Sequence, residues 1–390
     1  MIGKRKNIDF QGPGVIITGG GTGGHLFPGI AIAQCFREQW PDVRVLFVSA
    51  GTPIEKQIIP SLGFDFERIA SEGIKGRSLT SRIRAMAKLM LGVGTAVRIL
   101  MKFKPAIVVG MGGYSSAPMV LCAWIFGIRI VLHEQNAQPG ITNRMLARFA
   151  DCVFVSYEGA KDRLYARKIR TTGNPLRREI INAIDEAWQV GKERDQKNDG
   201  RFRVFVIGGS QGAHSLNKTV IDAAAKVSIK GTLSVVHQTG RTDEAMVRQA
   251  YERTGIDATV KPFFDDMAVQ YRDADLIICR AGATTVAEIA CVGKPAVFVP
   301  FPHAADNHQA YNARELVEAG AAEMIAEADL SGDLMAEKID FYAARPELLT
   351  RMGERARKAG RPEAGRAIIG HCLDLMASPP RKRAVFYTCI

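Results

Sequence analysis

Two glycine-rich segments are the places in this chain where the backbone could bind phosphate groups. Gly19 to Gly24 follows an apolar run that begins at Val15, and Gly208 to Gly212 follows one that begins at Val204. Helical spacing of apolar residues starts directly after each glycine segment, which predicts a strand, a tight turn and a helix. Backbone N–H groups at a helix N-terminus bind anions because the helix dipole is positive there. Each turn is therefore a candidate diphosphate site, with close packing of helix on sheet as the alternative.

Neither turn has the other features of a nicotinamide or ATP site. A dinucleotide-binding fold places a carboxylate at the end of the next strand, where it binds a ribose. The next strands end in Ser49-Ala50 and in the segment Leu233 to Gly240, which contains no carboxylate. The Gly-Lys-Ser/Thr sequence of ATPase phosphate loops is also missing, and the His133-Glu134 pair lacks the second histidine of a zinc-protease helix. We therefore expect no cofactor and no metal ion.

A denser group of polar side chains lies in the last third of the chain. Glu288 falls just inside the helix that follows the turn Gly282 to Thr285, where its carboxylate could accept hydrogen bonds from two sugar hydroxyls. The alternative is that Glu288 only complements the positive end of its helix. His308, Gln309 and Asn312 are spaced so that two of them share one helix face. They would offer donors and acceptors to a polyol, or else simply begin a solvated helix.

The pattern of strand, glycine turn and helix occurs twice in each half of the chain, with second copies at Ala106 to Phe126 and Asp275 to Gly293. This repetition predicts an α/β fold of two Rossmann-like domains in tandem, each with a parallel sheet. The tripeptide Gly173-Asn174-Pro175 breaks regular structure and predicts the junction. The expected parts are an N-terminal domain at 1–174, a second domain at 175–349, a helix at about 350–376 that packs back on the first domain, and a basic tail at 377–390.

Charge favours an anionic partner, because 52 lysines and arginines outnumber 40 acidic residues and give a formal net charge of +12. Eight basic residues and no acidic ones lie between Lys75 and Lys104, with methionine, isoleucine and valine at roughly helical spacing. Such a segment would bind an anionic membrane surface, or else belong to the core with its charges solvated. Nucleic acid is not an expected partner, since no basic motif interleaved with aromatic residues is found.

The expected location is the cytoplasm, with peripheral contact to a membrane. Seven cysteines are scattered without a CxxC pair, which argues against a disulfide framework. The first residues lack the apolar core of a signal peptide, and no apolar run reaches the roughly 20 residues needed to span a bilayer.

Together the motifs resemble those of the MurG family, GT-B glycosyltransferases that convert lipid I to lipid II in peptidoglycan synthesis. The matching stretches occur in the family's order from residue 19 to residue 313. They read GGGTGGHLFPGIAIA, GMGGYSSAP, LHEQNAQPGITNR, GNPLR, GGSQGA, DDM, RAGATTVAEIA and PFPHAADNHQAYNA. The resemblance implies a GT-B fold, in which the parallel sheets of the two Rossmann-like domains face a central cleft. It also implies transfer of N-acetylglucosamine (GlcNAc) from UDP-GlcNAc to lipid I at the cytoplasmic face of the bacterial inner membrane. A UDP-GlcNAc 2-epimerase or another GT-B glycosyltransferase is the alternative.

The resemblance also places UDP-GlcNAc mainly in the second domain and the acceptor diphosphate against the glycine loops of the first domain. It assigns roles to single residues as follows. The donor-binding positions are Phe264 and Met267 at the uracil, Glu288 at the ribose, Ser210 and Arg177 with Ala283, Thr284 and Thr285 at the diphosphate, and His308, Gln309 and Asn312 at the GlcNAc hydroxyls. The acceptor-side positions are Thr22, Gly23, Gly24, His25 and Asn136. Some members have Gln-Gln where this chain has His308-Gln309.

The implied chemistry is an inverting displacement at the anomeric carbon. Helix N-termini and Arg177 would stabilise the charge that builds up on the departing diphosphate without a metal. His25 begins a helix beside the cleft and is the leading candidate for the base that takes the acceptor's proton. The alternatives are that Asp306 is the base, or that His25 only positions the acceptor.

Overall fold

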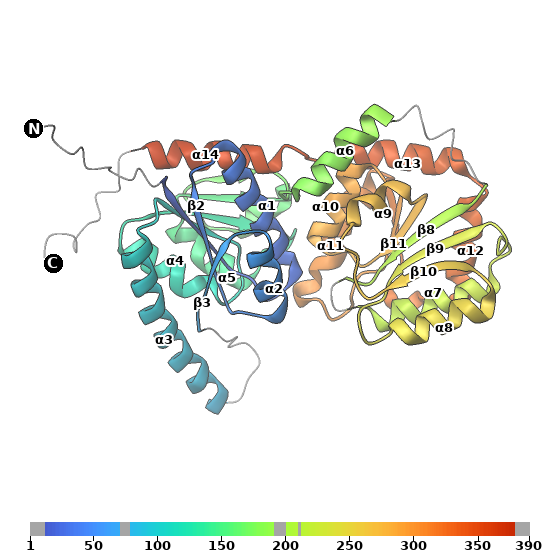
Figure 1. Cartoon of the computed structure of the whole chain (residues 1–390), viewed down its shortest axis with the longest axis horizontal. Coiled ribbons are helices and arrows are strands. Elements are labelled where there is room, and N and C mark those ends of the chain that lie inside the picture. Colours follow the sequence, from blue (N-terminus) through green and yellow to red (C-terminus); the bar gives the residue numbers. More distant parts are fainter. Residues whose placement is uncertain (1–11, 71–78, 191–199, 210–211, 379–390) are drawn as a thin grey trace, which may run out of the picture.

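The computed structural model describes residues 12–70, 79–190, 200–209 and 212–378, which form two α/β domains (Figure 1). The sheet of the first domain has seven strands in the order β3-β2-β1-β4-β5-β6-β7, and all neighbours are parallel. Its strands are β1 (Gly14–Thr18), β2 (Arg44–Ser49), β3 (Asp65–Arg68), β4 (Ile107–Gly110), β5 (Arg129–Glu134), β6 (Cys152–Val155) and β7 (Ile169–Thr171).

The second domain repeats this plan with six parallel strands in the order β10-β9-β8-β11-β12-β13. Its strands are β8 (Phe202–Ile207), β9 (Leu233–Gln238), β10 (Asp257–Lys261), β11 (Leu276–Cys279), β12 (Ala296–Phe298) and β13 (Ala322–Met324). The expected pair of Rossmann-like domains with parallel sheets is therefore confirmed.

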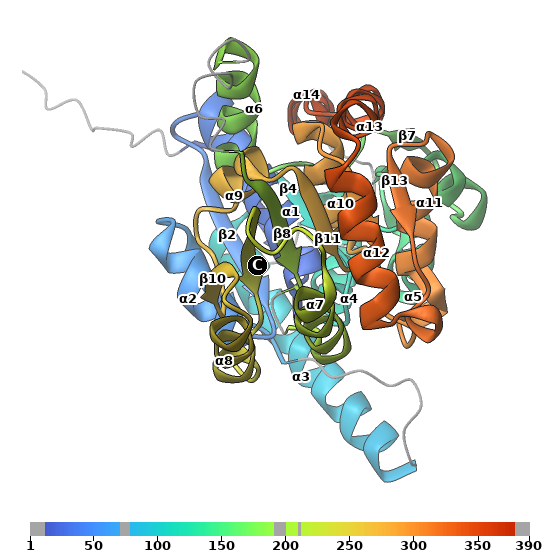
Figure 2. The same ribbon diagram turned by 90° about the vertical axis from the view of Figure 1, so that its right-hand side faces the viewer.

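Helices cover both faces of each sheet (Figure 2). Those of the first domain are α1 (Gly23–Gln39), α2 (Pro53–Ser61), α3 (Leu79–Phe103), α4 (Ser116–Ile125) and α5 (Ile141–Leu146). The later helices are α6 (Arg178–Val190), α7 (His214–Lys226), α8 (Glu244–Thr254), α9 (Met267–Asp273), α10 (Ala283–Val292), α11 (His308–Glu318), α12 (Gly332–Ala343), α13 (Pro346–Ala359) and α14 (Ala364–Ala377). Of the helices in the described ranges, none is long and apolar enough to cross a bilayer.

Burial on both faces explains why the central strands read as unbroken apolar runs. In β1, Val15 and Ile17 pack into one core with α1 and α14, whereas Ile16 packs into another with α3 and α4. All three side chains are at most 1% exposed. Each face of this strand therefore needs its own apolar residues.

In each sheet the strand order reverses beside the first strand of the domain. β1 lies between β2 and β4, and β8 lies between β9 and β11. Ligands of open α/β sheets bind at the carboxyl ends of the strands where the order reverses. The loops that follow β1, β4, β8 and β11 lie at these two points, so the topology brings all four predicted turns to ligand-binding positions.

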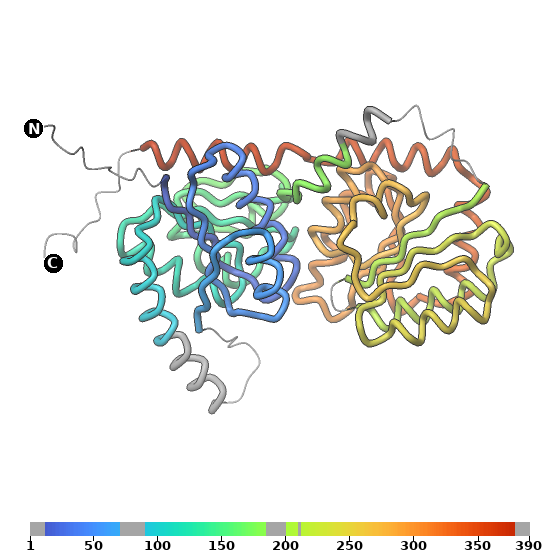
Figure 3. Tube along the Cα trace, in the orientation of Figure 1, coloured from blue at the N-terminus to red at the C-terminus, as the bar shows by residue number. Residues whose placement is uncertain are grey.

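The C-terminal segment differs from the expected single helix at about 350–376. It forms α13 and α14, which are separated by Gly360-Arg361-Pro362 (Figure 3). Proline cannot continue a helix because it lacks an N–H donor and restricts the residue before it. α13 packs on α10 in the second domain and α14 packs on α1 in the first, where Ile368 and Ile369 are fully buried. The chain therefore crosses between the domains a second time at this break.

Candidate active site

Glu288 is the centre of a buried polar cluster on α10. Its Oε1 atom accepts a hydrogen bond from Arg177 Nη2 at 3.1 Å, and its Oε2 atom accepts one from the Tyr271 hydroxyl at 2.9 Å. The side chains of Arg177 and Glu288 are 11% and 3% exposed. Each carboxylate oxygen has a second lone pair, so Glu288 can still accept a hydrogen bond from a ligand hydroxyl.

Arg177 connects this cluster to the first domain. Its guanidinium carbon lies 4.7 Å from the centre of the Phe27 ring on α1, and Nη1 pairs with Glu179 at 3.1 Å. Burial lowers the pKa of Arg177, but the charges of Glu288, Glu179 and Tyr271 and the hydrogen bond to Glu288 together raise it, so the net shift is upward. A fixed positive charge therefore lies where the two domains meet. The sequence placed Arg177 at the diphosphate and Glu288 at the ribose, and the structure joins the two in one ion pair.

The first turn of α10 contains Ala283, Thr284 and Thr285, and Gly282 is its N-cap. Thr284 Oγ1 is buried and has no hydrogen-bond partner among the described residues. A buried hydroxyl without a partner costs roughly 1–3 kcal/mol, and a ligand oxygen at the helix N-terminus would satisfy it. The turn therefore has an unused donor as well as unpaired backbone N–H groups. Ser210, which was expected to face the same ligand, lies outside the described residues.

Phe264 and Met267 offer little side-chain surface to a ligand, because they are 2% and 6% exposed. The Phe264 ring packs edge-on against Phe205 with 6.0 Å between ring centres. The backbone N–H of Phe264 donates to Gln238 Oε1 at 3.1 Å. The structure thus places the Phe264 side chain in the core, from which mainly the backbone can contact a base, and the contact of Phe264 with the uracil stays a prediction.

Asn312 is fully buried and joins the two domains. Its Oδ1 atom accepts a hydrogen bond from the Ala137 N–H at 2.9 Å. Its Nδ2 atom donates to Asn136 Oδ1 and to the Ala281 carbonyl, both at 3.2 Å. In this structure both donors of the Asn312 amide bind protein, and one lone pair of Oδ1 is left for a ligand. The contact of Asn312 with GlcNAc hydroxyls stays a prediction. Asn136, expected on the acceptor side, is part of the same contact.

The first turn of α11 presents the other two residues expected at the sugar. His308 Nδ1 donates to the Ala305 carbonyl at 2.8 Å, and Gln309 Oε1 accepts from the Phe301 N–H at 2.9 Å. These two hydrogen bonds orient both side chains. Neither bond involves the Nε2 atom of His308 or of Gln309. Asp306, the alternative base, lies in the preceding turn with an exposed side chain and a φ of 51°.

His25 lies in the first turn of α1, next to the N-cap Thr22 and to Gly23 and Gly24. Its Nδ1 atom is 3.1 Å from Gln135 Oε1, and Gln135 Nε2 donates to the Met111 carbonyl at 3.1 Å. A carbonyl only accepts hydrogen bonds, so the amide nitrogen of Gln135 must face Met111 and its oxygen must face His25. Nδ1 of His25 therefore carries the hydrogen, and Nε2 is the acceptor nitrogen.

A carboxylate that sequence analysis missed organises the first glycine turn. Glu55 is fully buried on α2. Its Oε1 atom accepts from the Gly21 N–H at 2.8 Å, and its Oε2 atom accepts from Gly51 and Thr52 at 3.0 and 2.7 Å. The capping-box spacing of Thr52 and Glu55 was the available sequence signal. It explains the two local bonds, whereas the bond to Gly21 depends on the tertiary structure.

Replacing Glu55 with alanine should lower the free energy of unfolding by about 1–3 kcal/mol, because three backbone N–H groups lose their acceptor. Urea denaturation would measure the change. The Glu55→Gln variant keeps one acceptor oxygen and should lose less. Equal stability of Glu55→Ala and the wild type would show that the carboxylate does not hold the turn.

The two parallel-sheet domains and the polar site where they meet define a two-domain glycosyltransferase. Residues 15–155 match the glycosyltransferase family 28 N-terminal domain, and residues 203–365 match the C-terminal domain of the same family. A curated relative from Geotalea uraniireducens (strain Rf4) is 43% identical over 357 residues, which cover 91% of this chain and 96% of the relative. It is named UDP-N-acetylglucosamine–N-acetylmuramyl-(pentapeptide) pyrophosphoryl-undecaprenol N-acetylglucosamine transferase. The chain belongs to this family, the MurG glycosyltransferases.

Solved structures agree with this assignment. The crystal structure of Acinetobacter baumannii MurG matches with a TM-score of 0.73 at 29% identity, covering 93% of this chain and 100% of that chain. A UDP-GlcNAc 2-epimerase from Neisseria meningitidis, solved bound to UDP-GlcNAc, matches with a TM-score of 0.65 at 13% identity, over 93% of this chain and 100% of that chain. The likeness to the epimerase is one of fold alone.

Proposed function

We propose that this protein transfers GlcNAc from UDP-GlcNAc to the 4-hydroxyl of N-acetylmuramic acid in undecaprenyl-diphospho-MurNAc-pentapeptide (lipid I), giving lipid II and UDP. The names of relatives that match over nine-tenths of the chain support this pair of substrates. The observation that supports binding of the donor, UDP-GlcNAc, is the polar cluster on α10. Thr284 and Glu288 are four residues apart and share one helix face, with the Arg177 charge beside them.

The displacement forms a bond from the acceptor oxygen to the anomeric carbon and breaks the bond from that carbon to UDP, with inversion. The electron pair of the broken bond leaves with the diphosphate. Arg177 and the N-terminus of α10 would stabilise this charge in a place shielded from water. Glu288 would hold the ribose hydroxyls with its remaining lone pairs while it keeps the Arg177 fork in position.

The proton of the acceptor hydroxyl would pass to Nε2 of His25. The hydrogen bonds from His25 to Gln135 and from Gln135 to Met111 support this role, because they fix the tautomer in which Nε2 is an acceptor. Asp306 remains the alternative base.

The test of this function is transfer of radiolabelled GlcNAc from UDP-GlcNAc to a short-chain lipid I analogue in metal-free buffer. Labelled lipid II analogue is the expected product. A folded protein that binds UDP-GlcNAc and forms no such product would contradict the proposed acceptor. Formation of an epimerised sugar nucleotide without any acceptor would point to 2-epimerase chemistry instead.

The proposal includes peripheral binding to the cytoplasmic face of the membrane, through an apolar-basic patch on the adjacent helices α3, α4 and α5 and the residues directly after them. Its apolar members are 50–66% exposed, and its basic members are exposed as well. They are Met90, Leu91, Met101, Ile125 and Met145, with Lys102, Lys104, Arg144 and Arg148. Other side chains of α3, among them Ile99 and Leu100, are buried in the core. Residues 71–78, the side chains of 79–89 and the tail 379–390 lie outside the described residues.

Introducing glutamate at Leu91 and Met145 together should weaken binding to vesicles that contain anionic phosphatidylglycerol by at least about ten-fold, because burying one such side chain contributes roughly 1.5–3 kcal/mol. Vesicle sedimentation measures the partition. Met324→Glu is the matched control, since Met324 is 40% exposed on β13 of the other domain. Equal binding of the double variant and the control would place the membrane contact elsewhere.

A further inference from the structure

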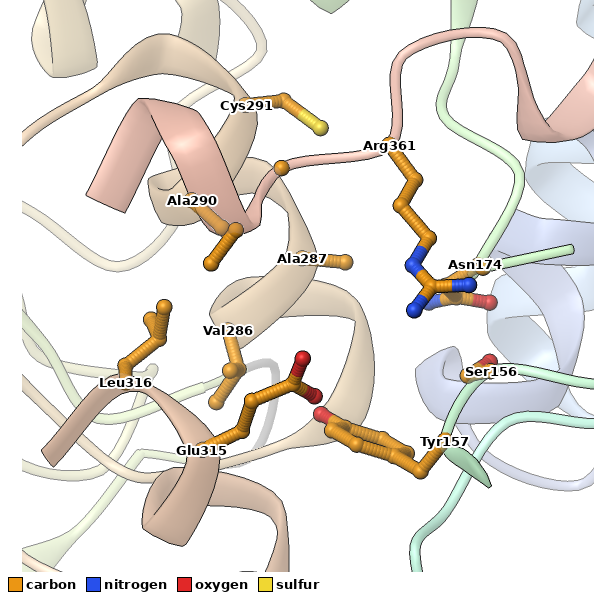
Figure 4. Close-up of a pocket in the computed structure, with 13 residues that line it drawn as sticks. Ser156, Tyr157, Asn174, Val286, Ala287, Ala290, Cys291, Glu315, Leu316 and Arg361 are labelled. Carbon is orange, nitrogen blue, oxygen red and sulfur yellow. The ribbon is translucent and has the colours of Figure 1, made fainter. Parts of the chain in front are cut away.

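A cavity lies where the chain crosses between the two domains (Figure 4). The outward crossover contains Gly173 and Asn174, and the return crossover contains Gly360 and Arg361. The two segments touch, because a Cβ atom added to Gly173 would lie 2.7 Å from Arg361 Cβ. The loop after β6 forms one wall of the cavity, and helices α10 and α11 of the second domain form the other.

One end of the cavity offers hydrogen-bond donors and a positive charge. Asn174 is 3% exposed, and neither Nδ2 nor Oδ1 of its amide has a hydrogen-bond partner among the described residues. Buried amides are nearly always hydrogen-bonded, so this one is suited to a ligand. The Arg361 side chain extends toward Asn174 and Ser156 (Figure 4). Arg361 also interacts electrostatically with Glu158, which lies outside the cavity.

The wall of the cavity also carries a negative charge. The Glu315 carboxylate on α11 lies beside the Tyr157 hydroxyl of the first domain (Figure 4). Burial, and to a lesser extent Glu315, raise the pKa of Tyr157, so its hydroxyl stays protonated. The rest of the wall includes aliphatic side chains, those of Val286, Ala287, Ala290 and Leu316.

We propose that this cavity binds a small zwitterion of the size of a free α-amino acid. Its carboxylate would bind Arg361 and Asn174 Nδ2, its ammonium group would bind Glu315, and its short aliphatic part would face α10. The cavity leaves about 40 Å³ for the centres of water molecules. That space holds roughly three waters, or a ligand of comparable volume with about six heavy atoms.

Such a ligand would influence the angle between the domains, because its contacts come from both domains and from both crossovers. It would also touch α10, the helix that carries Thr284 and Glu288. Binding to the cavity and binding of a ligand at the donor site would then be coupled, and the coupling must act equally in both directions.

The test uses the full chain without donor or acceptor, so its outcome does not depend on the proposed transferase reaction. Saturation-transfer NMR and calorimetry would measure binding of glycine, L-alanine and D-alanine. Acetate and ethylammonium serve as probes that carry only one of the two charges. We expect at least one of the amino acids to bind at least ten-fold more tightly than both single-charge probes.

Variants locate the site. Arg361→Gln and Glu315→Gln change exposed side chains and should each weaken amino-acid binding at least ten-fold, whereas Arg351→Gln on the exposed face of α13 should leave it unchanged. No binding by any of the three amino acids would overturn the proposal. So would equally tight binding of acetate or ethylammonium, or binding that neither cavity variant alters.

Discussion

Replacing His25 with alanine should lower kcat by roughly 10²–10⁴-fold, the usual contribution of a general base. The KM for UDP-GlcNAc should stay nearly constant, because His25 belongs to the first domain and the donor cluster is on α10. Transfer of radiolabel at saturating lipid I analogue measures turnover, and calorimetry with UDP measures the donor site separately. Unchanged turnover would remove His25 from the mechanism and leave Asp306→Asn as the variant to examine.

Two changes at Gln135 distinguish proton transfer from simple positioning of the acceptor. Gln135→Leu removes the acceptor for Nδ1–H and should lower kcat, because the tautomer is no longer fixed. Gln135→Glu keeps an oxygen near Nδ1 and adds a negative charge that favours the protonated imidazole. Since the base must be neutral to act, the acidic limb of the pH profile of kcat should move to higher pH in Gln135→Glu. An unmoved limb would indicate that His25 does not titrate in the reaction.

Replacing Glu288 with alanine is expected to abolish most transfer and to lower the free energy of unfolding by about 3–5 kcal/mol. The stability loss follows because the buried Arg177 charge and the Tyr271 hydroxyl both lose their partner. Transfer falls because the same carboxylate holds Arg177 where the diphosphate charge develops. Urea denaturation measures the loss of stability and the radiolabel assay the loss of transfer, while UDP calorimetry shows whether the donor site still binds UDP.

Glu179→Ala is the matched control, because Glu179 pairs with the same guanidinium but its side chain is 44% exposed. Its loss should cost about 0–1 kcal/mol, as for other exposed ion pairs. Tyr271→Phe removes one hydrogen bond from Glu288 while keeping the ring in the core. Its loss of unfolding free energy should lie between those of Glu288→Ala and Glu179→Ala. A Glu288→Ala protein as stable and as active as Glu179→Ala would contradict the central role of the Glu288 cluster.

The strands and turns were the most predictable part of this protein. A strand buried on both faces must be apolar throughout, so Val15 to Ile17 and Leu276 to Cys279 were recognisable without a structure. The turns after β1 and β8 were recognisable because glycine permits the positive φ angles seen at Gly19 and Gly209. The C-terminal helix was misjudged in one respect, since the break at Gly360 to Pro362 divides it between the domains.

Side-chain partners were less predictable, because they come from distant parts of the chain. Glu55 meets Gly21 across 34 residues and Glu288 meets Arg177 across 111. Asn312, which the resemblance places at the GlcNAc hydroxyls, binds residues 136 and 137 of the other domain. Nothing local distinguishes an asparagine that faces a ligand from one that faces another domain.

The sequence by itself determined the class of fold, the glycine turns and the family, because these depend on local residue types and on motifs in a fixed order. Only the tertiary structure decided which carboxylate meets which cation, which nitrogen of His25 is the acceptor, and where the two crossovers enclose a cavity. The physical reason is that hydrogen bonds and ion pairs depend on distances of about 3 Å between atoms. Those distances are set by how the sheets, helices and domains pack, not by positions along the chain.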